Sequence, residues 1–210
     1  MTANKGGILD LFPADPKVNL LPCDGVVNYY GSILSPCDAA DYFEALMTTV
    51  TWNHDEAVIF GKHIVTSRKV AWYGDANYNY NYSGARRTAL PWTRELQALR
   101  SLVEQKTGET FNSCLCNLYH SGSEGMGWHS DDEDALGKDT AIASLSLGAV
   151  RKFCLRHKRQ KELEQVSILL EDGGLLVMKG ATQANWKHSI PKSAKIAAPR
   201  INLTFRMIAR

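Results

Sequence analysis

The stretch Arg200-Ile201-Asn202-Leu203-Thr204-Phe205-Arg206 alternates strictly between polar and apolar side chains. A period of two residues is typical of a β-strand that lays one face on an apolar core. The polar face, which carries both arginines, has two explanations. It is either the solvated face of a sheet, the commoner case for a lone strand, or the inner lining of a barrel. In a barrel, the two guanidiniums start from Cα atoms about 20 Å apart at the strand rise, and can grip a small dianion from both ends.

The rest of the chain predicts an α+β fold. One helix begins at Ser35-Pro36, with serine as N-cap and proline in the first turn, and a second begins near Thr93 and ends at Gly108. Strand patterns follow at residues 111–119, 141–147, 152–156, 166–170, 175–178 and 201–207. Two helices followed by short strands favour a sandwich or barrel. Residues 60–84, rich in Tyr, Asn and Gly, are predicted as a loop that either packs over the core or stacks on bases.

Length and composition indicate one globular domain. The chain has 210 residues, of which 44% are hydrophobic and 22% charged. It contains no apolar run long enough for a membrane span and no secretory leader pattern, so we expect a soluble protein that is not secreted. Its five cysteines are odd in number and lack a CxxC spacing, and we expect all of them to be reduced and structural.

Charge is unevenly distributed along the chain. The net charge is only +2, yet residues 151–161 hold six Lys or Arg and no acid, and the acids gather at residues 131–134. Such segregation suits a surface that contacts phosphate backbones, although solvated loops produce it as well. Charge alone therefore leaves nucleic-acid binding undecided.

Three residues have the chemistry of a metal site. His129 and Asp131 lie two residues apart in an extended segment, and His188 follows 57 residues later. A His-x-Asp pair by itself is common in surface loops. Together with a second histidine on an adjacent barrel strand, it forms the two-histidine, one-carboxylate triad of non-haem Fe(II) oxygenases. Zinc is an alternative occupant of the same ligands.

These residues carry a resemblance. The order Asn117-Leu118-Tyr119, His129-Ser130-Asp131, His188 and the strand at 200–206 resembles the AlkB family of Fe(II)- and 2-oxoglutarate-dependent dioxygenases, and the match covers residues 58–208. Four segments resemble the branch acting on double-stranded DNA in particular: Phe60-Gly61-Lys62, Arg68-Lys69, Tyr73-Gly74-Asp75-Ala76 and Ala198-Pro199-Arg200.

The resemblance implies a double-stranded β-helix, or jelly roll, with N-terminal helices. In this scheme the single domain 1–210 divides into a lead-in and helix (1–57), nucleotide-recognition loops and a helix (58–110) and the catalytic core (111–210). The implied cofactors are Fe(II), 2-oxoglutarate as co-substrate and O2. The implied ligands are His129, Asp131 and His188 for the metal, and Asn117, Tyr119, Arg200, Asn202, Thr204 and Arg206 for 2-oxoglutarate.

The resemblance also implies the substrate: DNA alkylated at base nitrogens, such as 1-methyladenine or 3-methylcytosine, in double or single strands. A flipped base would stack between Tyr82 and His129, with Phe60 filling the gap it leaves. Asp132 is either a partner for a cationic lesion or a solvated acid. The residues implied in substrate binding are Phe60, Gly61, Lys62, Arg68, Tyr80, Tyr82 and Asp132, with Lys62, Arg68 and residues 156–161 contacting phosphates.

Two other functions stay open at this point. One is an RNA, protein or small-molecule dioxygenase on the same core. The other is a non-catalytic barrel that binds damaged nucleic acid, although a pure binding module has no use for a dicarboxylate site. We expect a monomer without a membrane partner, located in the cytoplasm of a bacterium or the nucleus of a eukaryote.

Overall fold

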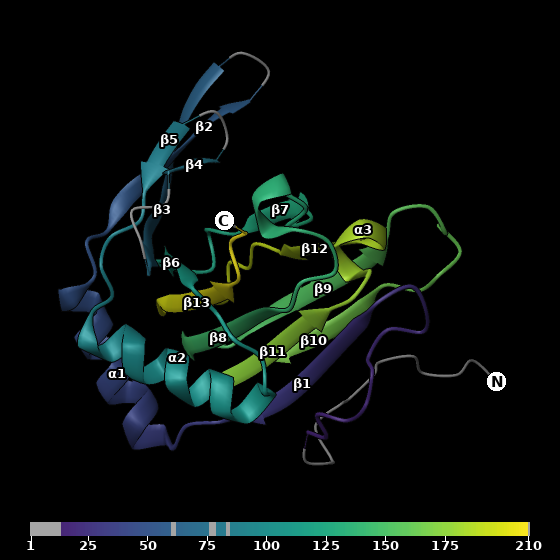
Figure 1. The fold of residues 1–210 in the computed structure, drawn as a ribbon, viewed down its shortest axis with the longest axis horizontal. Helices are drawn as coiled ribbons and strands as arrows, with labels where there is room; N and C mark the ends of the chain where they lie inside the picture. Colours follow the sequence, from purple (N-terminus) through teal and green to yellow (C-terminus); the bar gives the residue numbers. More distant parts are fainter. Residues whose placement is uncertain (1–13, 60–61, 76–78, 83–84, 210) are drawn as a thin grey trace.

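The computed structural model describes residues 14–59, 62–75, 79–82 and 85–209. Its strands are β1 (Val26–Ser32), β2 (Asn53–Ile59), β3 (Lys62–Gly74), β4 (Asn79–Tyr82), β5 (Ala85–Thr88), β6 (Ser113–Tyr119), β7 (Met126–His129), β8 (Ile142–Gly148), β9 (Arg151–His157), β10 (Val166–Leu170), β11 (Gly174–Lys179), β12 (Trp186–Ile190) and β13 (Arg200–Arg206). The helices are α1 (Pro36–Thr49), α2 (Arg94–Thr107) and the short α3 (Thr182–Asn185), with a 3-10 turn at Asp134–Leu136 (Figure 1).

Two antiparallel sheets form the body of the molecule. The large sheet has the strand order β1-β11-β8-β13-β6-β3-β2, and the small sheet has the order β10-β9-β12-β7. From β6 onward the chain crosses repeatedly between them, with β6, β8, β11 and β13 in the large sheet and β7, β9, β10 and β12 in the small one. This alternation is a double-stranded β-helix, so the predicted α+β jelly roll is confirmed. The large sheet also recruits β1, β2 and β3, and therefore draws strands from all three segments of the predicted domain scheme.

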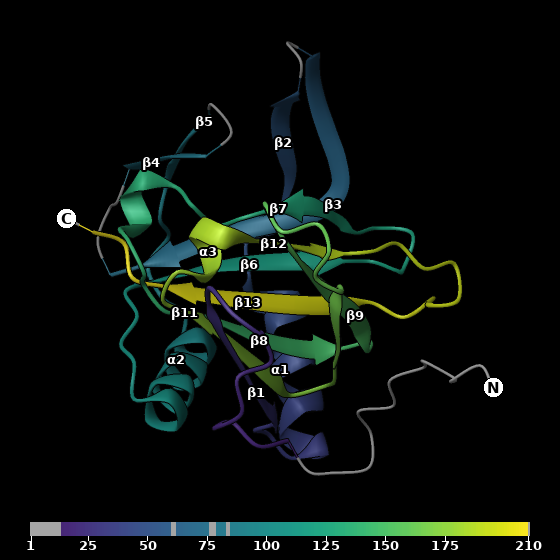
Figure 2. The same cartoon turned by 90° about the vertical axis from the view of Figure 1, so that its right-hand side faces the viewer.

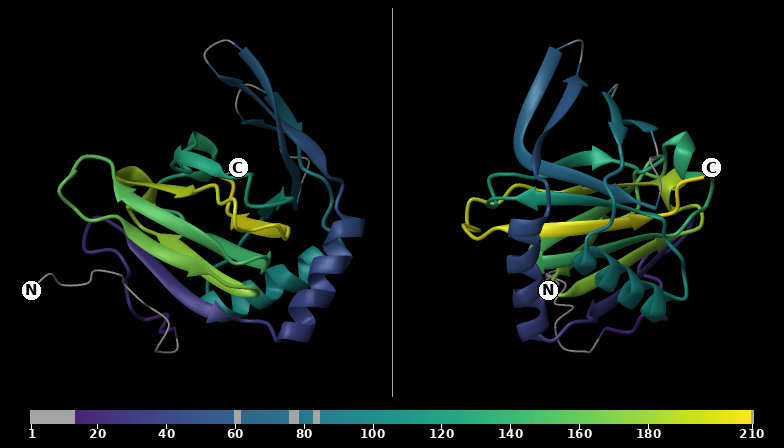
Figure 3. Two further views of the ribbon diagram at one scale, coloured as in Figure 1. Left: turned by 180° about the vertical axis from the view of Figure 1, so that it is seen from behind. Right: turned by 60° about the vertical axis from the view of Figure 1, so that its left-hand side comes forward.

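The two long helices form where the sequence predicts them. The side chain of Ser35 caps α1 by accepting from the Asp38 amide, and Thr93 caps α2 by accepting from the Leu96 amide. Gly108 ends α2 at φ 73°, a left-handed conformation that favours glycine. Both helices lie along the outer face of the large sheet, where Leu46, Leu99 and other apolar side chains share one core cluster with the sheet (Figure 3).

Strand β13 is central in the large sheet, between β8 and β6. Its apolar side chains Ile201, Leu203 and Phe205 are fully buried against the helix side. The polar face is buried as well: Arg200 is 1% exposed, Thr204 7% and Arg206 6%. Of the two explanations for that face, the solvated one is therefore wrong and the inner lining is correct.

The predicted loop at 60–84 is wrong where the structure describes it. A long strand, β3, pairs with both β2 and β6, and β4 pairs with β5 in a separate ribbon. The β2–β3 hairpin and the β4–β5 ribbon project from one side of the two-sheet body (Figure 2). The composition is that of a turn, but Asn79-Tyr80-Asn81-Tyr82 alternates with period two, which the compositional reading passed over. Phe60 and Gly61 lie outside the described residues.

All five cysteines are free, as predicted. Cys114, Cys116 and Cys154 are buried packing residues, but Cys37 is exposed, so a structural role does not extend to it. Among the residues that the structure describes, no helix has the length and apolar character of a membrane span.

Candidate active site

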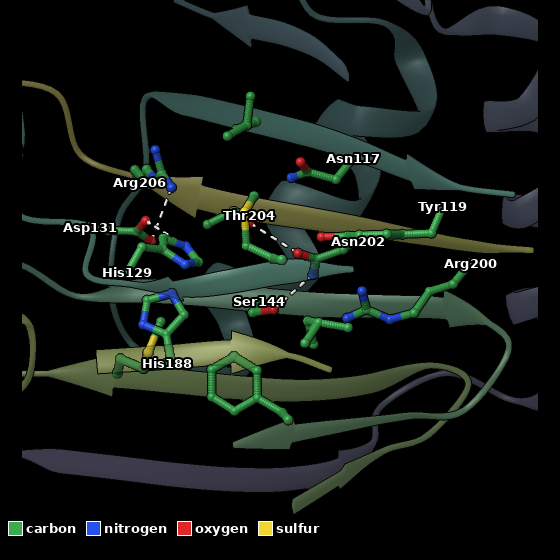
Figure 4. A pocket seen from close by; sticks show the side chains of 15 residues that line it. Asn117, Tyr119, His129, Asp131, Ser144, His188, Arg200, Asn202, Thr204 and Arg206 are labelled. Carbon is green, nitrogen blue, oxygen red and sulfur yellow. Dashed lines mark hydrogen bonds and ion pairs between the residues drawn. The ribbon is translucent and has the colours of Figure 1, made fainter. Parts of the chain in front are cut away.

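A pocket lies between the two sheets, and β6, β7, β8, β12 and β13 contribute to its walls (Figure 4). The sequence patterns predict most of its polar lining. Metal-type ligands gather at one end and Arg200 lies at the other, with polar side chains of β6 and β13 between them.

His129, Asp131 and His188 meet at the first end. His129 on β7 is the cross-strand partner of His188 on β12, and Asp131 follows β7 directly. One ligand atom from each of the three lies within 4.8 Å of the others. The Nδ1 of His129 lies 2.8 Å from the carbonyl oxygen of Gly127. If Nδ1 carries the proton and donates it there, Nε2 is left with its lone pair toward the group, as a metal ligand requires.

The charge states of these residues suit a divalent cation. Burial lowers the pKa of His188 to about 4, although the Asp131 carboxylate opposes this effect, so the imidazole is neutral at physiological pH. For Asp131, burial acts to raise the pKa, but Arg206 and the two histidines outweigh it and the pKa falls. Arg206 Nη2 lies 3.0 Å from Asp131 Oδ2. Two histidine nitrogens and one carboxylate fit Fe(II), and this donor set also fits zinc.

At the other end, Arg200 is a buried cation with unused hydrogen-bond donors. Its Nη2 donates to Ser146 Oγ at 2.9 Å, while Nε and Nη1 have no hydrogen-bond partner among the described residues. Burial lowers its pKa to about 10, with Arg151 as a smaller cause, so the guanidinium stays charged at neutral pH. A buried, half-satisfied guanidinium costs stability unless an anion completes it. The site therefore fits a carboxylate.

Polar residues between the two ends form a hydrogen-bonded chain. Thr204 Oγ1 donates to Asn202 Oδ1, and the Asn202 amide donates to Ser144 Oγ and to the carbonyl of Leu145. The resemblance implies that Thr204 binds 2-oxoglutarate, and in the structure its hydroxyl orients Asn202. Ser144, which lines the pocket, and Ser146, which binds Arg200, were not predicted from the sequence, although their alternation with apolar residues in β8 is a visible signal.

Strand β6 lies beside β13 in the large sheet and extends the same wall of the pocket. In register with β13, Tyr119 pairs with Arg200 and Asn117 pairs with Asn202. The Tyr119 ring has guanidinium carbons nearby, Arg200 at 5.5 Å and Arg151 at 5.6 Å from its centroid. Arg151, itself buried, donates to the carbonyls of Ser121, Glu124 and Pro191. This ties the loop after β6 to the loop after β12.

Comparison with known proteins agrees with this geometry. The family model described as the 2OG-Fe(II) oxygenase superfamily matches residues 26–206. A human relative, "DNA oxidative demethylase ALKBH2", is 36% identical over 204 residues, covering 93% of this chain and 78% of the relative. The chain is an AlkB-family member of the 2OG-Fe(II) oxygenase superfamily.

Two further proteins resemble this AlkB-family chain, one in sequence and one in structure. The bovine "Alpha-ketoglutarate-dependent dioxygenase alkB homolog 3" is 41% identical over 181 residues, which is 81% of this chain and 62% of that protein. This chain thus spans less than two thirds of that relative. A solved structure, "The structure of OsALKBH1", has a TM-score of 0.61 at 16% identity, covering 86% of this chain and 97% of the other, and supports the jelly-roll fold.

The residues predicted to bind substrate are only partly described in this AlkB-family structure. Lys62 lies on β3, and Tyr80 and Tyr82 on β4, but their side chains fall outside the described residues. Asp132 is exposed and pairs with Lys158 at 3.1 Å. Arg156 is exposed and lies over the Trp128 ring at 4.2 Å.

The phosphate contact predicted for Arg68 is wrong. The sequence reading gives it a phosphate contact at the surface, but it is only 6% exposed. Its guanidinium pairs with the Asp55 carboxylate and donates to Asn117 inside the fold. The prediction was wrong because β3 pairs with β6, which brings Arg68 next to Asn117 behind the pocket.

Proposed function

We propose that this chain is an Fe(II)- and 2-oxoglutarate-dependent dioxygenase that removes methyl groups from the nitrogens of DNA bases. The observation that carries the proposal is the pairing of a His-Asp-His group with a buried, half-satisfied arginine in one pocket. A metal triad alone also fits a hydrolase, and an arginine alone fits any anion site. Both together fit a metal enzyme with a carboxylate co-substrate. The activity named for the relatives, "DNA oxidative demethylase" among them, supports the substrate.

Each pocket residue has a distinct task in this proposal. His129, Asp131 and His188 hold the metal, and Arg206 keeps Asp131 ionised and oriented. Arg200 binds the far carboxylate of 2-oxoglutarate with Nε and Nη1, and Tyr119 and Asn117 line its path. When bound, iron and 2-oxoglutarate use O2 to hydroxylate the methyl group while the co-substrate becomes succinate and CO2, and the hydroxymethyl product releases formaldehyde. The protein's contribution is position and exclusion of water.

The proposal also assigns residues to the binding of a methylated base and its DNA strand. A base must leave the helix to reach a metal buried between two sheets, at a cost of a few kcal/mol that is smaller when methylation already blocks pairing. We propose that Tyr82 and His129 stack on that base, that Phe60 fills the gap, and that Asp132 faces a cationic lesion. Lys62 and the basic residues 156–161 are proposed to contact phosphates, which position the strand without reading its sequence.

The test is mass spectrometry of an oligonucleotide carrying one 1-methyladenine or 3-methylcytosine. With Fe(II), 2-oxoglutarate and ascorbate, we expect the product to lose one CH2 unit. His129→Ala should abolish this loss, whereas His120→Ala, at an exposed histidine outside the pocket, should retain it. Retained activity in His129→Ala would contradict the metal assignment.

Substrate class is tested with the same lesion in three contexts: single-stranded DNA, duplex DNA and RNA. Faster demethylation of DNA than of RNA supports the proposal. A preference for RNA would identify an RNA dioxygenase on the same core. Absence of turnover on all three, with 2-oxoglutarate still bound, would contradict a nucleic-acid substrate.

A further inference from the structure

A buried ion pair lies beside the pocket and has no place in the tasks assigned above. Arg68 on β3 is 6% exposed and Asp55 on β2 is 4% exposed. The two side chains form a salt bridge in the β2–β3 hairpin, next to the point where β3 begins to pair with β6. Removing two charged side chains from water costs several kcal/mol, which their mutual attraction must offset. A buried ion pair is therefore weak evidence for a purely stabilising role, and a functional role should be considered.

The guanidinium of Arg68 has a second partner, on the pocket wall. While Nη2 binds Asp55 Oδ2, Nη1 donates to Asn117 Oδ1. The rigid planar fork of arginine can hold two acceptors at once in a fixed relation, which a lysine ammonium does less well. The Arg68 guanidinium carbon also lies 5.9 Å from the centroid of the Tyr119 ring. Arg68 thus contacts both polar side chains that β6 presents to the pocket.

This contact determines which way the Asn117 amide faces. Arginine has donors only, so the amide must present its oxygen to Arg68. Its nitrogen is then turned away and keeps both hydrogens, and Nδ2 has no partner among the described residues. Asn117 lines the pocket beside Asn202, its cross-strand partner (Figure 4), so these hydrogens are available to an acceptor bound there.

We propose that Arg68 is a positioning residue for 2-oxoglutarate. Anchored by Asp55, it fixes Asn117 with its amide nitrogen toward the co-substrate, and it does not contact DNA phosphates. Because Asp55 neutralises its charge, Arg68 orients Asn117 without competing with Arg200 for the carboxylate. This inference rests on the proposed function only in naming 2-oxoglutarate as the ligand.

Binding of 2-oxoglutarate to the Mn(II)-loaded protein, measured by calorimetry, tests the proposal without turnover. We expect Arg68→Ala to raise the dissociation constant for 2-oxoglutarate about tenfold, the effect of losing one oriented hydrogen bond. Affinity for an unmethylated oligonucleotide should stay within about twofold, with an unchanged salt dependence. Arg94→Ala, an exposed arginine at the start of α2, is the matched control and should leave both constants unchanged.

A second variant guards against misfolding, because Arg68→Ala leaves Asp55 buried. Asp55→Leu/Arg68→Met removes both charges and should fold, since apolar replacements of buried pairs are often tolerated. It should show the same tenfold loss of 2-oxoglutarate affinity. Arg68→Lys keeps the positive charge but not the planar fork, and should retain only part of the wild-type affinity for 2-oxoglutarate.

A double-mutant cycle tests whether Arg68 acts through Asn117. In an Asn117→Ala background, adding Arg68→Ala should cause no further loss. Additive losses, or unchanged 2-oxoglutarate affinity in both Arg68 variants, would overturn the proposal. So would a tenfold loss of oligonucleotide affinity with a salt slope lowered by about 1, which is the signature of a phosphate contact.

The outcome is separable from that of the proposed function. If the wild-type protein binds 2-oxoglutarate but demethylates no oligonucleotide, the DNA substrate is wrong and the role of Arg68 stands. If the wild-type protein does not bind 2-oxoglutarate at all, the proposed function itself fails.

Discussion

The two arginines of β13 lie at opposite ends of one pocket, and they differ in their partners: Arg206 is paired with a carboxylate, and Arg200 is not. Arg206 is paired with Asp131 at the metal end, where the protein supplies both charges. Arg200 has Ser146 as its partner and two unused donors, so its end is incomplete without a ligand. We therefore expect Arg206 to contribute to the stability of the fold and Arg200 to bind an anion. Removing each should separate stability from binding.

The largest effect is expected at the paired end. Arg206→Met leaves Asp131 without its principal cation in a buried position, and should destabilise the metal-free protein by about 4 kcal/mol. Denaturant unfolding measures this change. Asp131→Leu/Arg206→Met, which removes both charges, should recover most of the loss while remaining inactive. If Arg206→Met were as stable as the wild type, the pair would contribute nothing to the fold.

Low pH should also destabilise the folded protein at the metal end, through protonation of His188. In the metal-free protein burial lowers the pKa of His188 to about 4, against 6.5 for a histidine in the unfolded chain. The unfolded state thus binds more protons between these values, and stability falls as pH drops from about 6.5 to 4, by about 3 kcal/mol for a shift of this size. Comparing unfolding curves of wild type and His188→Asn over this pH range isolates the contribution. A parallel pH dependence in the two proteins would contradict it.

The unpaired end should respond in binding and not in stability. Arg200→Met removes a half-satisfied buried cation, so we expect the melting temperature of the ligand-free protein to stay unchanged or rise. The KM for 2-oxoglutarate should increase about 100-fold, equivalent to about 2.7 kcal/mol. Melting curves with and without 2-oxoglutarate, together with initial rates, measure both. A large loss of stability with an unchanged KM would reverse the comparison between the arginines.

The smallest effect is expected between the two ends. Thr204→Val deletes the hydroxyl that donates to Asn202 Oδ1 and keeps the side-chain shape. The loss should be about 1 kcal/mol, seen as a fewfold increase in the KM for 2-oxoglutarate. Ser167→Ala, at a serine on β10 outside the pocket, serves as control. An unchanged KM in Thr204→Val would show that Asn202 needs no such orientation.

Local sequence determined a large part of this protein. Alternation identified β13, cap residues identified α1 and α2, and the spacing of His129, Asp131 and His188 identified a metal group that the fold brings together. The strand, the caps and the His129-x-Asp131 pair were predictable because each depends on neighbours in the chain: a strand repeats every two residues, a cap acts within one turn, and His-x-Asp places two ligands on one side of an extended segment.

Tertiary structure decided the rest. Alternation cannot say which face of β13 looks into the barrel, because both faces become buried once helices cover one side and the small sheet covers the other. Arg68 looked like a surface cation until β3 paired with β6 and placed it between Asp55 and Asn117. The difference between Arg200 and Arg206 likewise depends on residues about 55 to 75 positions away in the chain, Ser146 and Asp131. Sequence gives a residue its chemistry, and only the pairing of distant strands gives it a partner.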